Sequence, residues 1–423
     1  MEKVLTKNMR PGEPMEIDEY ERAGGYQGLK RALKMAPLEV QELVGRVNLR
    51  GRGGAGFPAG KKWALVPMEQ AARRPKYLCI NADEMEPGTM KDRLLMEGDP
   101  HQLIEGAITS AYAIQADCCY IFLRWAYKLS ARRLAKAIDE AYAHRYLGKN
   151  IQNSGYSLEM RLHTSAGRYM CGEASAMLDA VQGKRATPRS RPPHAEVCGL
   201  WGKPTVVQNV ETICCVHHIV RNGPEWFMKL SKTEEGGTKI YGCSGRVNNP
   251  GVWELPMGTP VRDILFEHAG GMQSGYQFKG LLPGGASSNF IRQEHLDTPM
   301  DFSHMEAVGS RLGTGTMVVM DDRICPVGVQ LSLQEFFARE SCGWCTPCRE
   351  GLPWIARALR AIEEGTGQAQ DMDVLDLNAK HIRLGNTFCA LAPGAMFPLE
   401  SALRFWREDF LEHVRQKRCP WKE

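Results

Sequence analysis

Three cysteines spaced every third residue, followed by a distant fourth, constrain the fold of this chain more than any other feature. Cys342, Cys345 and Cys348 form a C-x2-C-x2-C motif, and Cys389 lies further along the chain. A loop with this spacing wraps three corners of a [4Fe–4S] cube. The fourth thiolate can come from another element, because only its sulfur must reach iron. We therefore expect the chain to fold so that Cys389 lies beside the motif.

Structural zinc and unliganded thiols are the alternatives for these four cysteines. Zinc sites usually consist of two separated ligand pairs, whereas the middle cysteine of this motif would belong to two overlapping pairs. The motif therefore favours an iron–sulfur cluster. The other ten cysteines show no ligand spacing, and we interpret them as small buried hydrophobes: Cys79, Cys118, Cys119, Cys171, Cys198, Cys214, Cys215, Cys243, Cys325 and Cys419.

Length and composition indicate a globular protein of two to three domains. The chain has 423 residues, of which 43% are hydrophobic and 24% charged, which excludes disordered and fibrous classes. A net charge of +4 gives no argument for a nucleic-acid or membrane surface. No run of about 18 apolar residues exists, and the first residues have no apolar core. We expect no signal peptide, no transmembrane span and a reducing compartment.

Periodicity in the first half of the chain predicts a parallel α/β sheet. Residues 37–48 carry apolar side chains at helical spacing, and residues 76–80 and 119–123 are short apolar runs typical of buried strands. A helical pattern containing Leu103 and Ala107 lies between these two runs. Because strand, helix and strand alternate, we assign roughly residues 25–230 to a parallel α/β sheet.

The pattern changes twice in the second half. Short strand-like pieces with turns, such as 238–242 and 249–255, indicate a small α+β domain. Helical periodicity returns near Leu331, and the most linker-like stretch is 364–368. We therefore predict three domains with the boundaries 1–236, 237–330 and 331–423.

A glycine-rich loop, residues 49–63, follows the first predicted helix. It holds five glycines between positions 51 and 60 and four neighbouring cations. Glycines let the backbone N–H groups approach an anion closely, so a nucleotide or flavin phosphate is the expected ligand. The G-x-G-x-x-G match follows a helix and not a strand, and Phe57 stands where a Walker loop has lysine. We interpret it as a nucleotide loop of a different design, with a flexible surface turn as the alternative.

Aromatic and acidic residues near this loop suit the remaining parts of a nucleotide. Phe57 offers a face on which a planar ring could stack, although core packing is the alternative, and Lys62 is placed to contact a flavin or hydroxyl group. Carboxylates after a parallel strand suit ribose hydroxyls or a flavin imide N–H, or else cap the next helix. Such polar residues follow the strand that ends at Ile80: Asn81, Asp83, Glu84 and Glu86.

Together these motifs give the chain a close resemblance to the NADH-oxidising flavoprotein subunit of respiratory complex I. The likeness covers nearly the whole chain and rests on five segments: 49–63, 81–88, 167–173, 201–205 and 340–351. It implies a Rossmann-like FMN/NADH domain, a ubiquitin-like SLBB α+β domain and a C-terminal four-helix bundle carrying the [4Fe–4S] cluster. In such a protein FMN accepts a hydride from NADH and releases single electrons, so no residue acts as acid or base in the hydride step.

The resemblance also implies the residues of the cofactor site. Lys62 and Glu86 would position the cofactors, and NADH would stack near Phe57. The cluster ligands would be Cys342, Cys345, Cys348 and Cys389. The full predicted cofactor-binding set is Gly51, Arg52, Gly53, Gly54, Ala55, Gly56, Phe57, Gly60, Lys62, Asn81, Asp83, Glu84, Glu86, Tyr169, Gly172, Glu173, Arg191, Gln208, Asn209 and Thr212.

Several positions depart from the family pattern. Ala174 stands where the family usually has a second glutamate, Gln208 replaces an asparagine, and Trp125 replaces a glycine. Arg191 and His194 lie near the expected adenosine side. Loss of a carboxylate and gain of cations would weaken repulsion of a 2′-phosphate. We therefore expect NADPH to be tolerated better than in relatives.

Three functions follow from this resemblance. The leading one is the electron-input subunit of an NADH:quinone oxidoreductase. The second is the diaphorase subunit of an NAD-linked hydrogenase or formate dehydrogenase, and the third is a degenerate paralogue that keeps only the cluster. The expected partners are a thioredoxin-like [2Fe–2S] subunit and a large iron–sulfur subunit, with no nucleic acid. Through them the chain would lie on the cytoplasmic face of the inner membrane.

Overall fold

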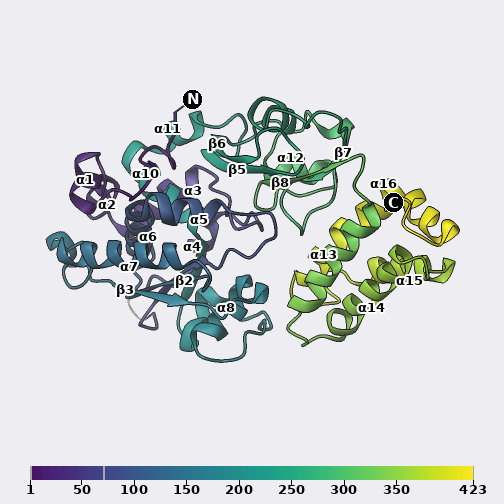
Figure 1. Ribbon diagram of the computed structural model, residues 1–423. Helices are drawn as coiled ribbons and strands as arrows, with labels where there is room; N and C mark the ends of the chain where they lie inside the picture. The colour runs from purple at the N-terminus through teal and green to yellow at the C-terminus, as the bar shows by residue number, and fades with distance from the viewer. Residues whose placement is uncertain (1, 70–71, 423) are drawn as a thin grey trace.

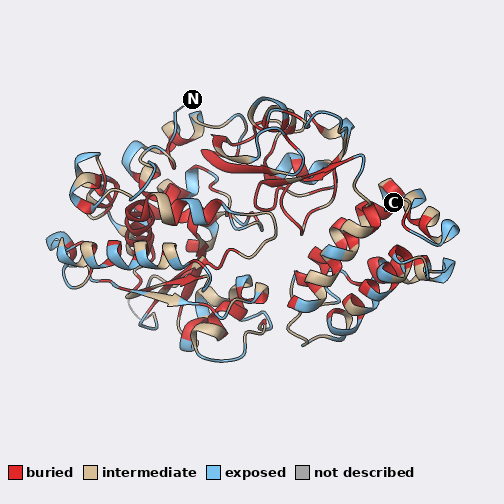
Figure 2. Ribbon diagram, viewed as in Figure 1, coloured by how far each residue is buried: buried red, intermediate tan, exposed pale blue. Residues whose placement is uncertain are grey.

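Three groups of elements follow one another along the chain in this computed structural model, which describes residues 2–69 and 72–422 (Figure 1). The first group, purple to teal, surrounds a sheet. The second, in green, contains another sheet, and the third, green to yellow, consists of helices. Figure 2 shows buried residues along both sheets and on the inward faces of the helices.

Four parallel strands form the first sheet, in the order β3-β2-β1-β4. Ile80 of β1 pairs with Ile121 of β2 on one side and with Gln208 of β4 on the other, so β1 lies inside the sheet. Asn81 and Asn209 are paired neighbours at the carboxyl ends of their strands. The parallel α/β prediction is confirmed by β1 (Tyr77–Ala82), β2 (Cys118–Leu123), β3 (Glu159–Thr164) and β4 (Thr205–Asn209).

Helix α6 (Pro100–Ile114) is almost entirely buried and packs against α10 (Val210–Asn222). It begins at a proline, which has no N–H to leave unpaired, and the Asp99 carboxylate accepts a hydrogen bond from the Gln102 N–H. A Cβ on Gly106 would lie 2.2 Å from the carbonyl oxygen of Ile213. Glycine is therefore required where these two helices approach most closely.

Further helices and turns complete the first group. They are α1 (Ile17–Arg22), α2 (Gln27–Ala32), α3 (Pro37–Arg46), α4 (Ala59–Trp63), α5 (Lys91–Gly98), α7 (Lys128–Ala143), α8 (Ala174–Val181), α9 (Ala195–Cys198) and α11 (Pro224–Lys229), with the short turns η1 (Ile151–Asn153), η2 (Tyr169–Gly172) and η3 (Leu200–Gly202).

The second sheet is mixed and has the strand order β6-β5-β8-β7. Its central pair, β5 and β8, is parallel, and the outer strands are antiparallel to them. Tyr241, Leu281 and Met317 belong to a core that is separate from that of the first sheet. The elements are β5 (Thr238–Ser244), β6 (Gly251–Pro256), β7 (Phe278–Leu282), β8 (Thr316–Asp321), α12 (Phe302–Ala307), η4 (Asp263–His268) and η5 (Gln293–His295).

Four helices form the last group and share one apolar core. The predicted stripe of Leu352, Ile355, Leu359 and Ile362 is buried on one face of α14. The first of the four helices begins at Pro326, before the predicted start near Leu331. No helix in the described residues is long and apolar enough to cross a membrane. The helices are α13 (Pro326–Glu340), α14 (Thr346–Glu363), α15 (Ala369–His381) and α16 (Leu391–Gln416).

Candidate cofactor site

The glycine-rich loop connects α3 to α4 and folds back on itself. The Gly51 N–H donates to the Phe57 carbonyl over 3.0 Å, which closes the loop. Gly54 has a φ of 109°, a conformation that side chains with a Cβ rarely adopt. A Cβ on Gly53 would lie 3.2 Å from Cβ of Asn209. The loop backbone therefore lies directly against the carboxyl end of β4.

A cavity of about 240 Å³ lies in front of this loop, where the three groups of elements meet. Eleven predicted residues line it: Gly53, Gly54, Ala55, Asn81, Asp83, Glu84, Glu86, Tyr169, Gly172, Glu173 and Asn209. The wall also includes Gly284 and Ser287 from the second group, and Cys389 from the third. One cavity thus joins the predicted nucleotide loop to a predicted cluster ligand.

Asp83 leaves an acceptor unpaired at this cavity. Its Oδ1 accepts a hydrogen bond from Ser165 Oγ over 2.8 Å, whereas its buried Oδ2 has no partner among the residues that the structure describes. Burial raises the pKa of Asp83 to about 6. An unpaired buried acceptor is costly unless a ligand supplies a donor. This arrangement fits a flavin, which carries a ring N–H.

Glu84 caps a helix in this structure. Its carboxylate accepts hydrogen bonds from the backbone N–H groups of Asp92, over 2.8 Å, and Arg93, over 3.1 Å, in the first turn of α5. Burial, opposed by these bonds and by Lys91, raises the pKa of Glu84 to about 7. Helix capping was the alternative to ligand binding for the acidic residues after β1, and Glu84 adopts it.

Glu86 ties two groups of elements together at the cavity. Its Oε2 accepts from the Tyr169 hydroxyl over 2.6 Å, and its Oε1 accepts from the Ser287 N–H over 2.6 Å. Burial raises the pKa of Glu86. Both carboxylate oxygens accept hydrogen bonds, so the orientation of this side chain at the cavity is fixed.

A buried network of charges lies behind the loop. Lys91 Nζ is 2.6 Å from Asp92, 3.1 Å from Glu211 and 3.1 Å from Asn209 Oδ1, and Lys239 Nζ is 2.9 Å from Glu211. Burial opposes the charge of Glu211, yet Lys239 and Lys91 lower its pKa to about 2. Lys91 and Lys239 therefore compensate the buried carboxylates of Asp92 and Glu211 and fix this part of the cavity wall.

Nine predicted residues lie outside the cavity wall: Gly51, Arg52, Gly56, Phe57, Gly60, Lys62, Arg191, Gln208 and Thr212. The Arg52 guanidinium donates to the Gly236 carbonyl over 3.0 Å, and its backbone N–H donates to Thr212 Oγ1 over 2.8 Å. Lys62 Nζ donates to the Val207 carbonyl over 2.9 Å. Arg52, Lys62 and Thr212 therefore support the loop and β4 from behind.

The four predicted cluster cysteines come together from two parts of the chain. Cys342, Cys345 and Cys348 lie around the start of α14, and Cys389 lies just before α16. Burial and the nearness of the other three thiols raise the pKa of Cys348 to about 12. Burial, with the nearness of Glu173, Cys342 and Cys345, likewise raises the pKa of Cys389 to about 11. All four thiols therefore lie near one another, as a four-cysteine cluster requires.

Sequence reasoning missed the wall residues that come from distant segments. Ser287 holds Glu86, and Arg311 Nη2 donates to the Gly54 carbonyl over 3.0 Å. Lys91 belongs to no motif that the sequence singled out. A local signal near Ser287 is the glycine pair Gly284-Gly285, whose backbone lies close to Gly313 and Glu86.

We expect Asp83→Asn to stabilise the flavin-free chain at high pH. Folding raises the pKa of Asp83 from 3.8 to about 6, because the charged carboxylate is disfavoured in the folded chain. The free energy of unfolding is therefore highest below pH 4, where Asp83 is protonated, and falls as the pH rises through 6. The variant should recover about 1–3 kcal/mol at pH 8. Melting temperatures from pH 4 to 8, with exposed Asp139→Asn as the control, test this. Equal pH profiles for Asp83→Asn and the parent chain would contradict it.

In this molecule a parallel α/β domain carries a loop and a cavity that reaches one of four gathered cysteines. This combination is that of an iron–sulfur flavoprotein. The Nuo51 FMN-binding domain model matches residues 44–218, the SLBB domain model 241–288, and the NADH-ubiquinone oxidoreductase-F iron-sulfur binding region 328–413. The NADH-quinone oxidoreductase F subunit of Salmonella typhimurium is 50% identical over 96% of this chain and 91% of that protein. The second such F subunit of Rhizobium meliloti is 48% identical over 99% of both chains.

A solved NAD+-reducing [NiFe]-hydrogenase in the H2-reduced state has a similar fold, with a TM-score of 0.81 and 32% identity. It covers 94% of this chain, which spans 65% of the hydrogenase chain. The chain belongs to the family of NADH-quinone oxidoreductase F subunits. The resemblance inferred from the sequence motifs is thereby confirmed.

Proposed function

We propose that this chain is the electron-input subunit of an NADH:quinone oxidoreductase. FMN, when bound, accepts a hydride from NADH and gives up its electrons singly to the [4Fe–4S] cluster. The observation that carries the proposal is the shared cavity, whose wall contains both the glycine-rich loop and Cys389. Electrons leaving this cavity would meet a cluster ligand without crossing another domain.

The residues of this chain bind and orient the cofactors. Gly53 and Gly54 would bring backbone N–H groups to the FMN phosphate, and Asp83 would accept a hydrogen bond from the flavin ring. Glu86 and Tyr169 would position the nicotinamide nucleotide. The cluster would be held by Cys342, Cys345, Cys348 and Cys389.

The diaphorase subunit of a hydrogenase is the second candidate, and the structural likeness to the NAD+-reducing hydrogenase favours it. The two candidates place the same cofactors in the same cavity. They differ in the partner that takes the electrons. We infer that the partners are a thioredoxin-like [2Fe–2S] subunit and a large iron–sulfur subunit, and that they hold the chain at the cytoplasmic face of the inner membrane.

The domain boundaries are part of this proposal: 1–236 for the FMN/NADH domain, 237–330 for the SLBB domain and 331–423 for the cluster domain. Gly236 and Gly237 lie between α11 and β5, which supports the first boundary. Helix α13 begins at Pro326, so the first turn of the helical domain precedes the second boundary.

We expect Ala174→Glu to sharpen the preference for NADH over NADPH. Ala174 begins α8, next to Glu173, whose Oε1 is 2.7 Å from Arg191 Nη2. A second carboxylate here would repel a 2′-phosphate, and the NADPH/NADH ratio of kcat/KM should fall roughly tenfold. Ala174→Gln, which adds similar volume without charge, is the control. An equal NADPH/NADH ratio of kcat/KM in Ala174→Glu and in the parent chain would contradict this prediction.

Filling the cavity tests the proposed function. A Cβ on Gly172, which lines the cavity, would meet no atom within 4 Å, and the same holds for Gly45 on α3. Gly172→Val should therefore keep its iron and lose flavin affinity about tenfold or more, because it occupies cofactor space. Gly45→Val should keep both. Full flavin content and NADH oxidation in Gly172→Val would overturn the assignment of this cavity.

A further inference from the structure

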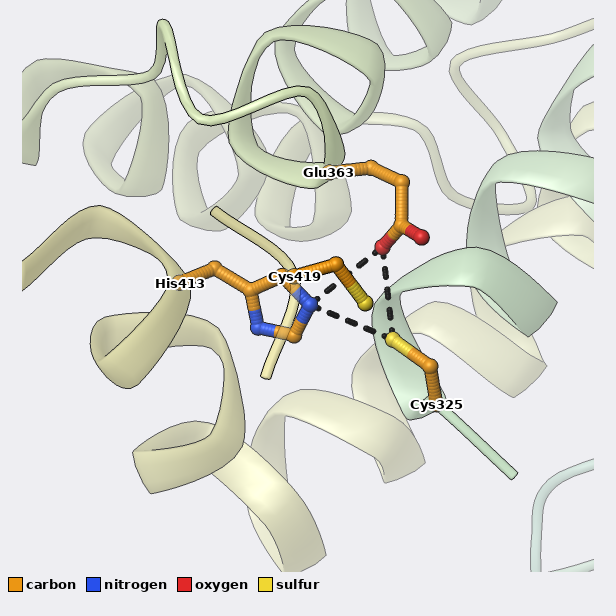
Figure 3. Close-up of side chains that lie close together, drawn as sticks. All are labelled: Cys325, Glu363, His413 and Cys419. Atoms are coloured by element: carbon orange, nitrogen blue, oxygen red, sulfur yellow. Dashed lines mark hydrogen bonds and ion pairs between the residues drawn. The ribbon is translucent and has the colours of Figure 1, made fainter. Parts of the chain in front are cut away.

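A second cluster of metal-type ligands lies in the helical part of the molecule, separate from the four predicted cluster cysteines. Cys325, Glu363, His413 and Cys419 each bring one ligand atom, and these atoms all lie within 4.8 Å of one another (Figure 3). Three of the residues are buried, and Cys325 is half-buried. We propose that they bind one structural Zn²⁺ ion.

The distances between the ligand atoms match those around a tetrahedral ion. Cys325 Sγ lies 3.2 Å from His413 Nε2 and 3.3 Å from Glu363 Oε2, and the last two atoms are 3.3 Å apart. Ligands bound to zinc at 2.0–2.3 Å are about 3.3–3.8 Å from one another. In Figure 3 the sulfur of Cys419 points toward the same centre. One ion therefore reaches all four ligands with little movement of the chain.

Neighbouring groups prepare two of the ligands for a metal. His413 Nδ1 lies 2.7 Å from the Asp409 carbonyl oxygen, which only accepts hydrogen bonds, so Nδ1 carries the proton and Nε2 keeps its lone pair. Cys325 is the N-cap of α13, and its Sγ accepts a hydrogen bond from the Gly328 N–H over 3.3 Å. This hydrogen bond holds the Cys325 side chain in a fixed direction.

The charges around the centre balance when a divalent ion is present. Two thiolates and one carboxylate carry three negative charges, and Zn²⁺ leaves one of them uncompensated. Lys422 Nζ lies 3.0 Å from Glu363 Oε1, the carboxylate oxygen that makes no contact with Cys325 or His413. Lys422 therefore supplies the remaining positive charge. Cysteine, histidine and glutamate side chains all bind zinc, which prefers tetrahedral geometry.

The ion would fasten the C-terminal tail to the helical bundle. Cys325 precedes α13, Glu363 ends α14, and His413 lies in the last turns of α16. Cys419 follows the end of α16 at Gln416, so its bond to the metal would close the tail over the bundle. The bundle that holds the cluster cysteines would then be cross-linked at its far ends.

Metal analysis of the full chain, purified with its iron–sulfur cluster, tests this proposal. We expect one zinc per chain beside the cluster iron, and zinc-edge X-ray absorption should show two sulfurs at about 2.3 Å and two lighter atoms at about 2.0 Å. Cys419→Ser should lose at least about tenfold in zinc affinity and keep its iron, and Lys422→Met should lose about tenfold. Cys198→Ser, outside the cluster, is the matched control.

Three results would overturn the proposal. The first is a chain that holds no zinc as purified and takes none up when Zn²⁺ is added. The second is zinc with four sulfur ligands, which would place it on the other cysteines. The third is a Cys325–Cys419 disulfide in the purified chain. Lys422→Met leaves all four ligands in place, so the proposal stays testable if Cys419→Ser does not fold. Flavin content and NADH oxidation are independent of these results.

Discussion

Replacing Cys389 by serine is expected to separate flavin reduction from electron transfer to the cluster. Cys389 is the proposed fourth ligand of the cluster and also lies in the wall of the cavity proposed to hold the flavin. Serine is a poor ligand for iron, so the iron content should fall from four atoms per chain toward zero. The flavin contacts proposed for Gly53, Gly54 and Asp83 do not involve this sulfur, and NADH should still bleach the flavin.

Iron analysis, electron paramagnetic resonance and the NADH-dependent flavin absorbance measure these effects in one preparation. Cys198→Ser is the control, since Cys198 is the last residue of α9 in the first group of elements and is not a predicted ligand. Full iron content together with an unchanged cluster signal in Cys389→Ser would show that another residue is the fourth ligand.

Removing the charge of Lys91 is expected to be the most destabilising change near the site. Its ammonium group is fully buried between Asp92 and Glu211, so Lys91→Met leaves two buried carboxylates with one fewer counterion. Breaking a buried ion pair in this way costs about 3–5 kcal/mol. Flavin affinity should fall as well, because the cavity wall loses the contacts that hold Asp92 and Asn209 in place.

Chemical denaturation of the flavin-loaded and flavin-free chains measures the first effect, and flavin titration measures the second. Lys136→Met is the control, since its ion pair with Glu16 is largely exposed, and little change in stability is expected there. A double variant, Lys91→Met with Asp92→Leu, should recover part of the loss, because it removes one of the stranded charges. A Lys91→Met chain as stable as its parent would contradict the account of this network.

The fold was largely predictable because its patterns are local. Residues 76–80 and 119–123 are apolar runs that became the paired strands β1 and β2, and the stripe through Leu352 and Ile362 became the buried face of α14. The start of α13 was placed too late, near Leu331. The helix begins at Pro326, and a proline at the first helical position is a start signal, but the cysteine that caps it is not.

The residues of the candidate site could be predicted where they are adjacent in the sequence. They could not be predicted where folding brings distant segments together. Predicted residues of the loop and of the segment after β1 line the cavity together. Arg52 belongs to the same loop, but its guanidinium points away from the cavity and donates to the Gly236 carbonyl. Sequence patterns carry no side-chain direction for such a residue. Lys91 and Ser287 came to the cavity from segments that carry no motif.

An anaerobic reductive titration of the purified chain, co-expressed with the small iron–sulfur partner, tests the central claim most directly. NADH is added stepwise while flavin absorbance and electron paramagnetic resonance are followed. The account predicts that NADH bleaches the flavin and that the signal of a reduced [4Fe–4S] cluster then appears. Bound flavin that NADH does not bleach, or full iron loading without any flavin, would contradict the electron-input function.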